Sequence, residues 1–185
     1  LHADMGAYLS SIAPLIPTVI CITLFSGLYK NPGIWGETTG TLTNTVPVDA
    51  YRGAGRPEAS YLVERLVDVA AQELKMDPIE IRRKNFIGKD EFPYQTPVAF
   101  LYDSGDYHAM FDKLEENGNY KGMRAAQAKA KEDGRLVGIG VSGCVEASGY
   151  GPAATVGALG FYGGMWEHGG IRVHPTGKVT AFTGS

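Results

Sequence analysis

The residues with the clearest chemical pattern lie at positions 48–59, where the sequence reads VDAYRGAGRPEA. Arg52 and Arg56 flank Gly53 and Gly55, which can take positive φ and let the backbone approach a partner closely. The proline that follows suits the first position of a helix. Helix-start amides, the positive end of the helix dipole and two arginines predict an anion-binding loop. An ordinary strand–turn–helix with two solvated arginines explains the same pattern equally well.

Other motifs for dinucleotide, catalytic or metal sites lack the neighbouring sequence that such sites need. Residues 138–143 read GIGVSG and match G-x-G-x-x-G, but a predicted helix precedes them and a poor helix sequence follows, so a dinucleotide site is rejected. Ser142, Cys144 and Glu146 alternate, which favours one face of a strand over a catalytic group. The histidines show none of the spacings of a metal site; they are His2, His108, His168 and His174.

Composition is that of a soluble globular chain, with 185 residues, 44% hydrophobic, 20% charged and a net charge of −3. No basic patch indicates nucleic acid binding. Cys21 and Cys144 are predicted to be two buried free thiols in a reducing cytosol. The apolar stretch at 12–25 contains two prolines and falls short of the roughly 20 residues of a membrane-spanning helix, so no transmembrane segment is expected.

The elements that position the loop follow from periodicity. Residues 1–30 are predicted to form strands, and the threonine-rich residues 36–48 form the strand that leads to the loop. A helix is predicted from Pro57 to about Leu74. Its apolar stripe is expected to lie in the core and consists of Leu62, Leu66, Val69, Ala70 and Leu74.

Further helices follow from capping signals. Asp77 is predicted to cap a short helix whose last turn, with Arg82, Arg83 and Lys84, is expected to be solvated. Asp106 is predicted to cap a helix ending near 116, and another runs from about 121 to 133 before Gly134. Residues 171–174 and 178–183 form a predicted hairpin.

This order predicts an α+β fold of mixed strands and packed helices. The expected organisation is a first subdomain at 1–88, a connecting loop at 89–105 and a second subdomain at 106–185. A chain that begins without methionine and stops after a hairpin is expected to be an internal fragment of a longer protein.

Residues 50–56, AYRGAGR, resemble the active-site loop of the molybdenum hydroxylases, which include xanthine dehydrogenase, aldehyde oxidase and aerobic carbon monoxide dehydrogenase. The resemblance covers nearly the whole chain and extends to residues 4–8, 43–45, 77–85 and 177–185. It is strongest to the carbon monoxide dehydrogenase-like large subunits whose loop has this sequence, often called form II. It implies that the two subdomains bind molybdopterin.

The resemblance implies roles for the loop residues. Tyr51, Arg52 and Gly53 would contact the molybdenum cofactor, whose metal takes its ligands from the pterin and from small groups rather than from protein. Ala54 and Gly55 would line the substrate pocket. Carbon monoxide dehydrogenases of established activity carry a copper-binding cysteine at the Gly53 position, so no copper is expected here. Purine oxidases carry a stacking aromatic at the Ala54 position, so a xanthine-type pocket is disfavoured.

The resemblance also implies the remaining parts of an enzyme. The cofactor would be molybdopterin cytosine dinucleotide, and electrons would pass to a small subunit with [2Fe-2S] clusters and a medium subunit with FAD. The family's catalytic glutamate would lie downstream of residue 185, so the chain alone is expected to be inactive. The location would be the cytoplasm, free or at the cytoplasmic face of the membrane.

Three classes of function therefore remain open. The first is a carbon monoxide dehydrogenase-like large subunit that oxidises its substrate with water as the oxygen source, and the same family also offers an aldehyde or N-heterocycle oxidoreductase. The second is a non-catalytic anion-binding module that uses the arginine loop. The third is a structural domain whose glycines allow tight packing.

Overall fold

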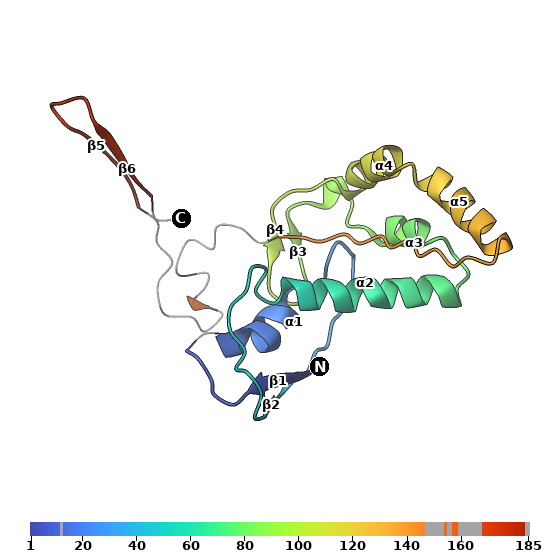
Figure 1. The fold of residues 1–185 in the computed structure, drawn as a ribbon, viewed down its shortest axis with the longest axis horizontal. Helices are drawn as coiled ribbons and strands as arrows, with labels where there is room; N and C mark the ends of the chain where they lie inside the picture. The colour runs from blue at the N-terminus through green and yellow to red at the C-terminus, as the bar shows by residue number, and fades with distance from the viewer. Residues whose placement is uncertain (12, 147–153, 155–156, 159–167, 184–185) are drawn as a thin grey trace. The chain divides into compact units, whose positions relative to one another are not determined.

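The computed structural model describes residues 1–11, 13–146, 154, 157–158 and 168–183. The chain divides into two compact units, Leu1–Val145 and Glu146–Ser185. Helices and short strands mix in the described residues, which confirms the predicted α+β class (Figure 1). The predicted subdomain boundaries at 88 and 106 stay a prediction.

The first unit is built along its longest helix, α2 (Arg56–Glu73). Gly55 takes a left-handed conformation at its N-cap, and a proline occupies its first turn, as expected for a helix that starts at a glycine turn. Helix α1 (Cys21–Thr23) and helix α3 (Pro78–Asn85) both contact α2 (Figure 1). The predicted helix is confirmed to within one residue at each end.

Residues 13–23 are helical, so the prediction of strands over residues 1–30 is wrong beyond the first strand. Strand β1 (His2–Gly6) pairs in parallel with β2 (Thr39–Leu42), which is shorter than the extended segment predicted at 36–48. Between them lie a 3-10 turn η1 (Ala13–Leu15), a π-helical turn η2 (Ile16–Ile20) and α1. The prolines in this stretch sit where helices begin, because proline is tolerated in a first turn.

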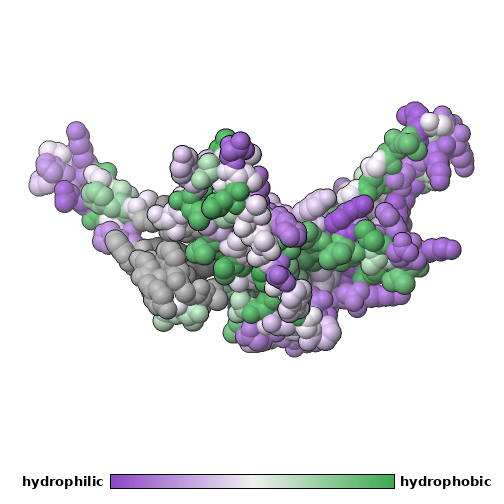
Figure 2. All heavy atoms as spheres, turned by 90° about the horizontal axis from the view of Figure 1, so that it is seen from below, coloured by the Kyte–Doolittle hydropathy of each residue, from purple (hydrophilic) through white to green (hydrophobic). Residues whose placement is uncertain are grey.

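The apolar stripe of α2 is not the core face, which corrects a second prediction. Leu66 and Leu74 are 69% and 63% exposed, whereas Glu64 is only 5% exposed. The helix turns this way because the Glu64 carboxylate has buried partners, described below. Apolar side chains consequently gather near the middle of the face seen from below (Figure 2).

The capped helices are confirmed. The Asp77 carboxylate accepts hydrogen bonds from the Ile79 and Glu80 amides at the start of α3. Asp106 caps α4 (Tyr107–Gly118), and α5 (Tyr120–Glu132) is followed by Gly134 at φ +75°. The main core joins these helices to residues near 28 and consists of Leu28, Tyr29, Ile79, Phe86, Ile87, Tyr102, Tyr107, Phe111 and Tyr120.

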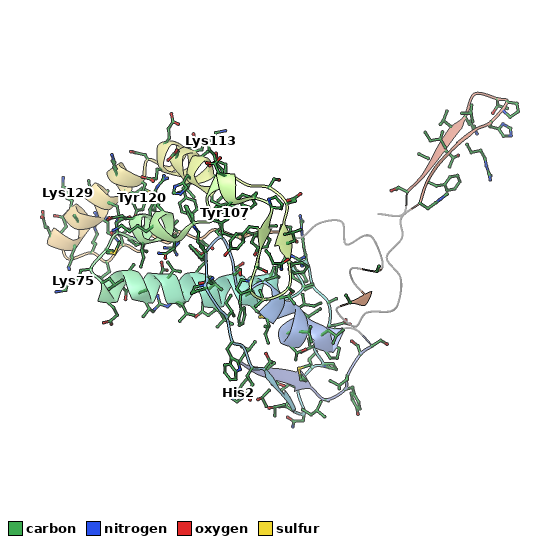
Figure 3. All side chains as sticks on the ribbon, turned by 180° about the vertical axis from the view of Figure 1, so that it is seen from behind. His2, Lys75, Tyr107, Lys113, Tyr120 and Lys129 are labelled. Carbon is green, nitrogen blue, oxygen red and sulfur yellow. The ribbon has the colours of Figure 1, made fainter. Side chains whose placement is uncertain are left out.

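The segment predicted as a plain loop at 89–105 contains short elements. A 3-10 turn η3 (Lys89–Glu91) precedes β3 (Tyr94–Gln95), which pairs antiparallel with β4 (Leu101–Tyr102). Figure 3 shows the labelled Tyr107 and Tyr120 among the helices that follow, whereas Lys113 and Lys129 point outward.

The second unit contains the predicted hairpin. Strand β5 (Gly169–Val173) pairs antiparallel with β6 (Val179–Thr183), and the turn between them has Gly177 at φ +82°. No helix among the described residues is long and apolar enough to cross a bilayer.

Candidate functional site

The predicted anion loop is a tight turn of residues 51–55 at the start of α2. The Ala54 amide donates to the Tyr51 carbonyl at 3.0 Å, and the Arg56 amide donates to the Gly53 carbonyl at 3.1 Å. Gly53, Ala54 and Gly55 all have positive φ, at +112°, +42° and +89°. Three successive left-handed residues turn the chain sharply, and for the alanine this conformation is uncommon.

The two arginines of the loop have different environments. Arg52 is exposed, as is the neighbouring Tyr51, whose relative exposure is 87%. Arg56 is buried at 9% exposure, and its Nη1 donates to the Gly53 carbonyl at 3.0 Å. The Arg56 guanidinium therefore braces the loop from within, and Arg52 is the arginine that faces solvent.

Gly55 places the end of the loop directly on the N-terminal helical turns. A Cβ at Gly55 would lie 2.8 Å from the Ile16 carbonyl oxygen and 3.0 Å from the Cys21 amide nitrogen. Gly53 has a similar limit, since its Cβ would lie 2.8 Å from the ring of Pro57. The loop is thus closely packed behind and open in front.

A buried ionic cluster lies two turns further along α2. The Glu64 carboxylate accepts from the Tyr29 hydroxyl at 2.5 Å, from Arg82 Nε at 2.9 Å and from the Gly143 amide at 3.1 Å. Arg82, whose side chain is fully buried, also donates to Asp68 at 2.9 Å and to the Val141 carbonyl at 2.9 Å.

The pKa directions fit a structural role for this cluster. Burial raises the pKa of the Tyr29 phenol, and the hydrogen bond to the Glu64 carboxylate adds to the rise. Burial alone would lower the pKa of Arg82, but its ion pairs with Glu64 and Asp68 outweigh burial and raise it. Each charged group has a bonded partner, so we assign the cluster to packing and not to catalysis. The prediction of a solvated α3 end is wrong for Arg82.

The two thiols differ, which corrects half of the cysteine prediction. Cys21 is fully buried, and burial, followed by the negative charge of Glu58, raises the pKa of its thiol to about 11. Cys144 is exposed rather than buried, and both thiols are free.

The glycine-rich segment 138–143 follows helix α5, so the predicted helix before it is confirmed, and the segment lies in no strand. Ser142, Cys144 and Glu146 are exposed, and the residues between them are more buried. Exposure therefore alternates along this segment as it does in a strand, although no strand among the described residues pairs with it. No group of three or more potential metal-ligating side chains gathers in the part of the chain that the structure describes.

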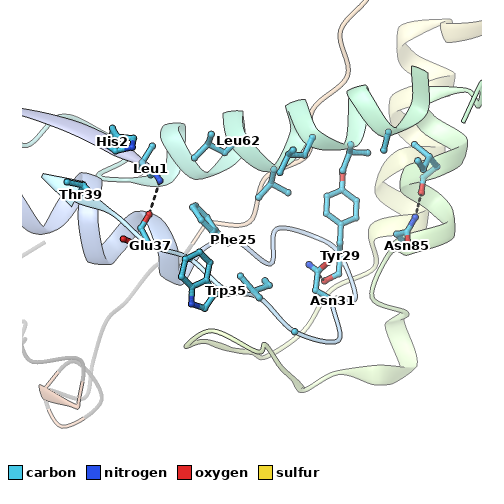
Figure 4. A pocket seen from close by; sticks show the side chains of 18 residues that line it. Leu1, His2, Phe25, Tyr29, Asn31, Trp35, Glu37, Thr39, Leu62 and Asn85 are labelled. Carbon is cyan, nitrogen blue, oxygen red and sulfur yellow. Dashed lines mark hydrogen bonds between the residues drawn. The ribbon is translucent and has the colours of Figure 1, made fainter. Parts of the chain in front are cut away.

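A groove of about 900 Å³ runs along α2. Leu62, Leu66 and Phe25 line it together with Trp35, which is 83% exposed (Figure 4). The Asn85 amide on its wall already donates to the Ile81 carbonyl at 2.7 Å. Its lining is mainly apolar, and the loop at 51–55 does not line it, so we do not assign the chemistry to this groove.

Sequence reasoning missed the ionic cluster and the packing behind the loop. Arg82 stands beside two similar basic residues, and nothing in that run distinguishes the buried one from its neighbours. The contact between Gly55 and Ile16 joins residues far apart in sequence, so no local pattern reports it. For Glu64, one signal was available in the sequence. Its carboxylate lies between Val63 and Val67, which pack against the core, so its position on the helix pointed to burial.

Comparison with known proteins gives a consistent result. Residues 1–86 match the family model described as "Molybdopterin cofactor-binding domain". The chain is 42% identical to the carbon monoxide dehydrogenase large chain of Hydrogenophaga pseudoflava, an alignment that covers 99% of this chain and 23% of that protein.

Solved structures agree in fold. Reconstituted CO dehydrogenase from Oligotropha carboxidovorans has a TM-score of 0.77 and 33% identity, covering 100% of this chain and 24% of that chain. Quinoline 2-oxidoreductase from Pseudomonas putida 86 has a TM-score of 0.84 and 34% identity, covering 99% of this chain and 23% of that chain. The chain thus spans about a quarter of the length of these relatives.

Proposed function

Because this chain belongs to the molybdenum hydroxylase family and corresponds to a portion of its catalytic large subunit, we propose that its loop at residues 51–55 borders the molybdenum centre of a carbon monoxide dehydrogenase-like enzyme. The enzyme oxidises its substrate with water as the source of oxygen. The observation that carries the proposal is the open glycine turn at the start of α2 in a chain with this family match.

The residues present fit a cofactor that brings its own metal ligands. Residues 53–55 carry no side chain larger than a methyl group, so the loop presents backbone there. A Cβ at Gly53 would lie 2.8 Å from the Pro57 ring, so the position has no room for a side chain. Tyr51 and Arg52 are exposed and free to meet the cofactor. When bound, the cofactor supplies the redox chemistry, and this chain's part is to hold a backbone edge against it.

Ala54 lies on the substrate side of the loop in this proposal, whereas Gly55, which was predicted to line the pocket with it, is buried against the Ile16 carbonyl. Ala54 provides no ring for stacking, and Gly53 provides no thiolate for copper. Both absences favour a substrate other than a purine and a reaction other than copper-dependent CO oxidation. The catalytic carboxylate comes from a part of the large subunit outside these 185 residues.

A second candidate, oxidation of an N-heterocycle or an aldehyde, is supported by one observation. The structural match to an enzyme named quinoline 2-oxidoreductase has a TM-score of 0.84, against 0.77 for the CO dehydrogenase. The anion-binding module is less well supported, because Arg56 is buried and braces Gly53 from within the loop.

The finer assignments extend the proposal to form II of the family. The cofactor is the cytosine dinucleotide form of molybdopterin, and the electrons pass to a [2Fe-2S] small subunit and an FAD medium subunit. The enzyme works in the cytoplasm or at the cytoplasmic face of the membrane. The names of two relatives, "Carbon monoxide dehydrogenase large chain" and "6-hydroxypseudooxynicotine dehydrogenase complex subunit gamma", support a large subunit that works in a complex of several chains.

The test is an assay of the intact large subunit with its partner subunits. Metal analysis is expected to find stoichiometric molybdenum and no copper. A substrate panel of CO, aldehydes and N-heterocycles separates the two candidates, because turnover of an aldehyde or a heterocycle supports the second one. A complex without molybdenum refutes the proposal. Robust CO oxidation with stoichiometric copper refutes the conclusion drawn from Gly53.

A further inference from the structure

The loop at residues 51–55 rests on a feature that the proposed function does not use. Gly55 is buried, and its Cα lies over the π-helical turn η2, where the Cys21 amide donates to the Ile16 carbonyl. Both atoms of this hydrogen bond lie under the position of a Cβ at Gly55, at 3.0 Å and 2.8 Å. We call the Ile16 carbonyl, the Cys21 amide and the Ile20 side chain the floor of the loop.

The floor is rigid where it meets the glycine. The two nearest atoms belong to backbone that is held in a helical hydrogen bond, so neither can rotate away from a new side chain. The third neighbour, Ile20 Cγ2 at 3.2 Å, is a partly buried side-chain atom with some freedom to move. π-Helical turns occur often beside functional sites, where one extra residue widens the turn.

The front of the loop is coupled to this contact. The Gly55 carbonyl accepts from Ala59 in α2, and the Gly53 carbonyl accepts from both the Arg56 amide and its guanidinium. The three positive-φ residues 53–55 form a single turn, so a displacement of Gly55 is transmitted to the backbone at Arg52 and Gly53.

The size of the displacement follows from contact distances. Atoms that would lie 2.8 Å apart must separate by about 1 Å to reach an ordinary contact. A shift of about 1 Å in a positioning element can reduce the rate by roughly a hundredfold. The expected effect is therefore large in catalysis even though the added group is one methyl.

We propose that the π-helical turn at Ile16–Ile20 is the positioning element of the active loop and that Gly55 is a positioning residue, which sets how far the backbone at Arg52 projects toward the molybdenum centre. This inference rests on the proposed function. It assigns a role to the N-terminal helical turns, and it adds a steric reason for glycine at position 55 to the one that its φ of +89° already gives.

The test compares Gly55→Ala with Gly134→Ala in the intact subunit complex. Gly134 also has positive φ, at +75°, but no atom lies within 4 Å of its Cβ position, so its substitution controls for both the added methyl and the backbone strain. Gly55→Ala is expected to leave the molybdenum content unchanged, to accelerate hydrogen exchange of the Ala54 and Arg56 amides at least tenfold, to alter the Mo(V) paramagnetic resonance spectrum and to lower kcat/KM by roughly 10–100-fold. Gly134→Ala is expected to match the wild type in all four measurements.

A second pair of variants keeps the test decisive if Gly55→Ala does not assemble. Ile20→Ala removes the side-chain part of the floor. Val19→Ala truncates a slightly smaller side chain to the same methyl on the same turn, at a position that is 45% exposed and whose atoms are not among the three nearest to a Cβ at Gly55. Ile20→Ala is expected to accelerate exchange of the loop amides severalfold and to change the Mo(V) spectrum slightly. Val19→Ala is expected to change neither.

The outcomes separate this inference from the proposed function. Unchanged exchange, or faster exchange with an unchanged Mo(V) spectrum, in a variant that contains molybdenum overturns the inference alone. A wild-type complex without molybdenum overturns the proposed function and this inference together.

Discussion

Helix α2 carries two regions that are built in opposite ways. Around Glu64 the contacts are made by side chains, with Arg82 fully buried and every charge bonded to a partner. At residues 51–55 the contacts are made by backbone, φ is positive at three successive positions, and Tyr51 and Arg52 face solvent. The first region fixes α2 to α3 and to the segment at Gly143, and the second exposes residues at the N-terminus of α2 to solvent. Changes in the first should therefore reduce stability, and changes in the second should reduce activity.

The largest expected effect on stability is that of Arg82→Met. The variant leaves the Glu64 carboxylate buried without its cation and removes the donor to the Val141 carbonyl. Breaking a buried ion pair in this way costs about 3–5 kcal/mol, measured as the free energy of unfolding of the chain in urea. Lys84→Met is the control, because that side chain is 61% exposed and pairs with Glu80 across one helical turn, an interaction worth about 0.3–0.5 kcal/mol. Equal losses of unfolding free energy in the two variants would show that the cluster around Glu64 does not stabilise the fold more than a surface ion pair does.

Gly53→Trp should abolish turnover of the intact complex, because under the proposed function the indole ring would stand between the loop backbone and the cofactor. The structure adds a cost to the fold: φ is +112°, and the new Cβ would meet the Pro57 ring at 2.8 Å. Such backbone strain costs about 1–3 kcal/mol. Gly134→Trp is the matched control, since Gly134 also has positive φ, at +75°, but has no atom within 4 Å of its Cβ position. Turnover should survive in the control, and turnover by Gly53→Trp would mean that the loop is not at the site.

The two regions also differ in how much the sequence reveals. Capped helix ends depend on residues three or four positions apart, and the predicted roles of Asp77, Asp106 and Gly134 are all confirmed. The loop sequence is equally local, and its glycines are enough to predict the turn. Its role at a metal site comes from the resemblance to a family and not from the physics of the turn.

The ionic cluster could not be predicted because its members come from four distant segments. Glu64 meets Tyr29, Arg82 and Gly143 only after the chain has folded, and these residues are separated from it by 35, 18 and 79 positions. The error about the apolar stripe has the same origin. A hydrophobic period predicts which face is apolar, but burial of the Glu64 carboxylate turned a different face of α2 inward. Helical residues at 13–23 escaped prediction because β-branched residues favour strands when considered alone.

Tyr29→Phe sharpens the account of the anchor by removing one hydrogen bond. The variant leaves the Glu64 carboxylate with one donor fewer, and a hydrogen bond to a charged group contributes about 1.5–3 kcal/mol. Tyr102→Phe is the matched control, because the Tyr102 hydroxyl is buried without a hydrogen-bond partner among the described residues. Urea unfolding should show a clear loss for the first variant and no loss for the second. A larger loss for Tyr102→Phe would show that the Tyr29 bond is not part of the anchor.

The smallest expected effect concerns pH and the cap of α3. Burial alone would raise the pKa of Asp77, but hydrogen bonds from the Ile79 amide and the Tyr120 hydroxyl outweigh burial and lower it. A carboxylate with a lowered pKa stabilises the fold above its unfolded value, near pH 4, and this stabilisation is lost as the pH falls through the folded value. The same contact, acting after burial, raises the pKa of Tyr120 to about 12.

Asp77→Asn keeps a capping oxygen but has no charge to lose, so its stability should fall less steeply than that of the wild type between about pH 5 and pH 2. The difference should stay under about 1 kcal/mol, because more than a third of the Asp77 side chain is exposed and solvent screens the charge. Parallel pH profiles for wild type and Asp77→Asn would show that the Asp77 charge adds nothing to the cap, so that the capping oxygen alone accounts for its contribution to α3.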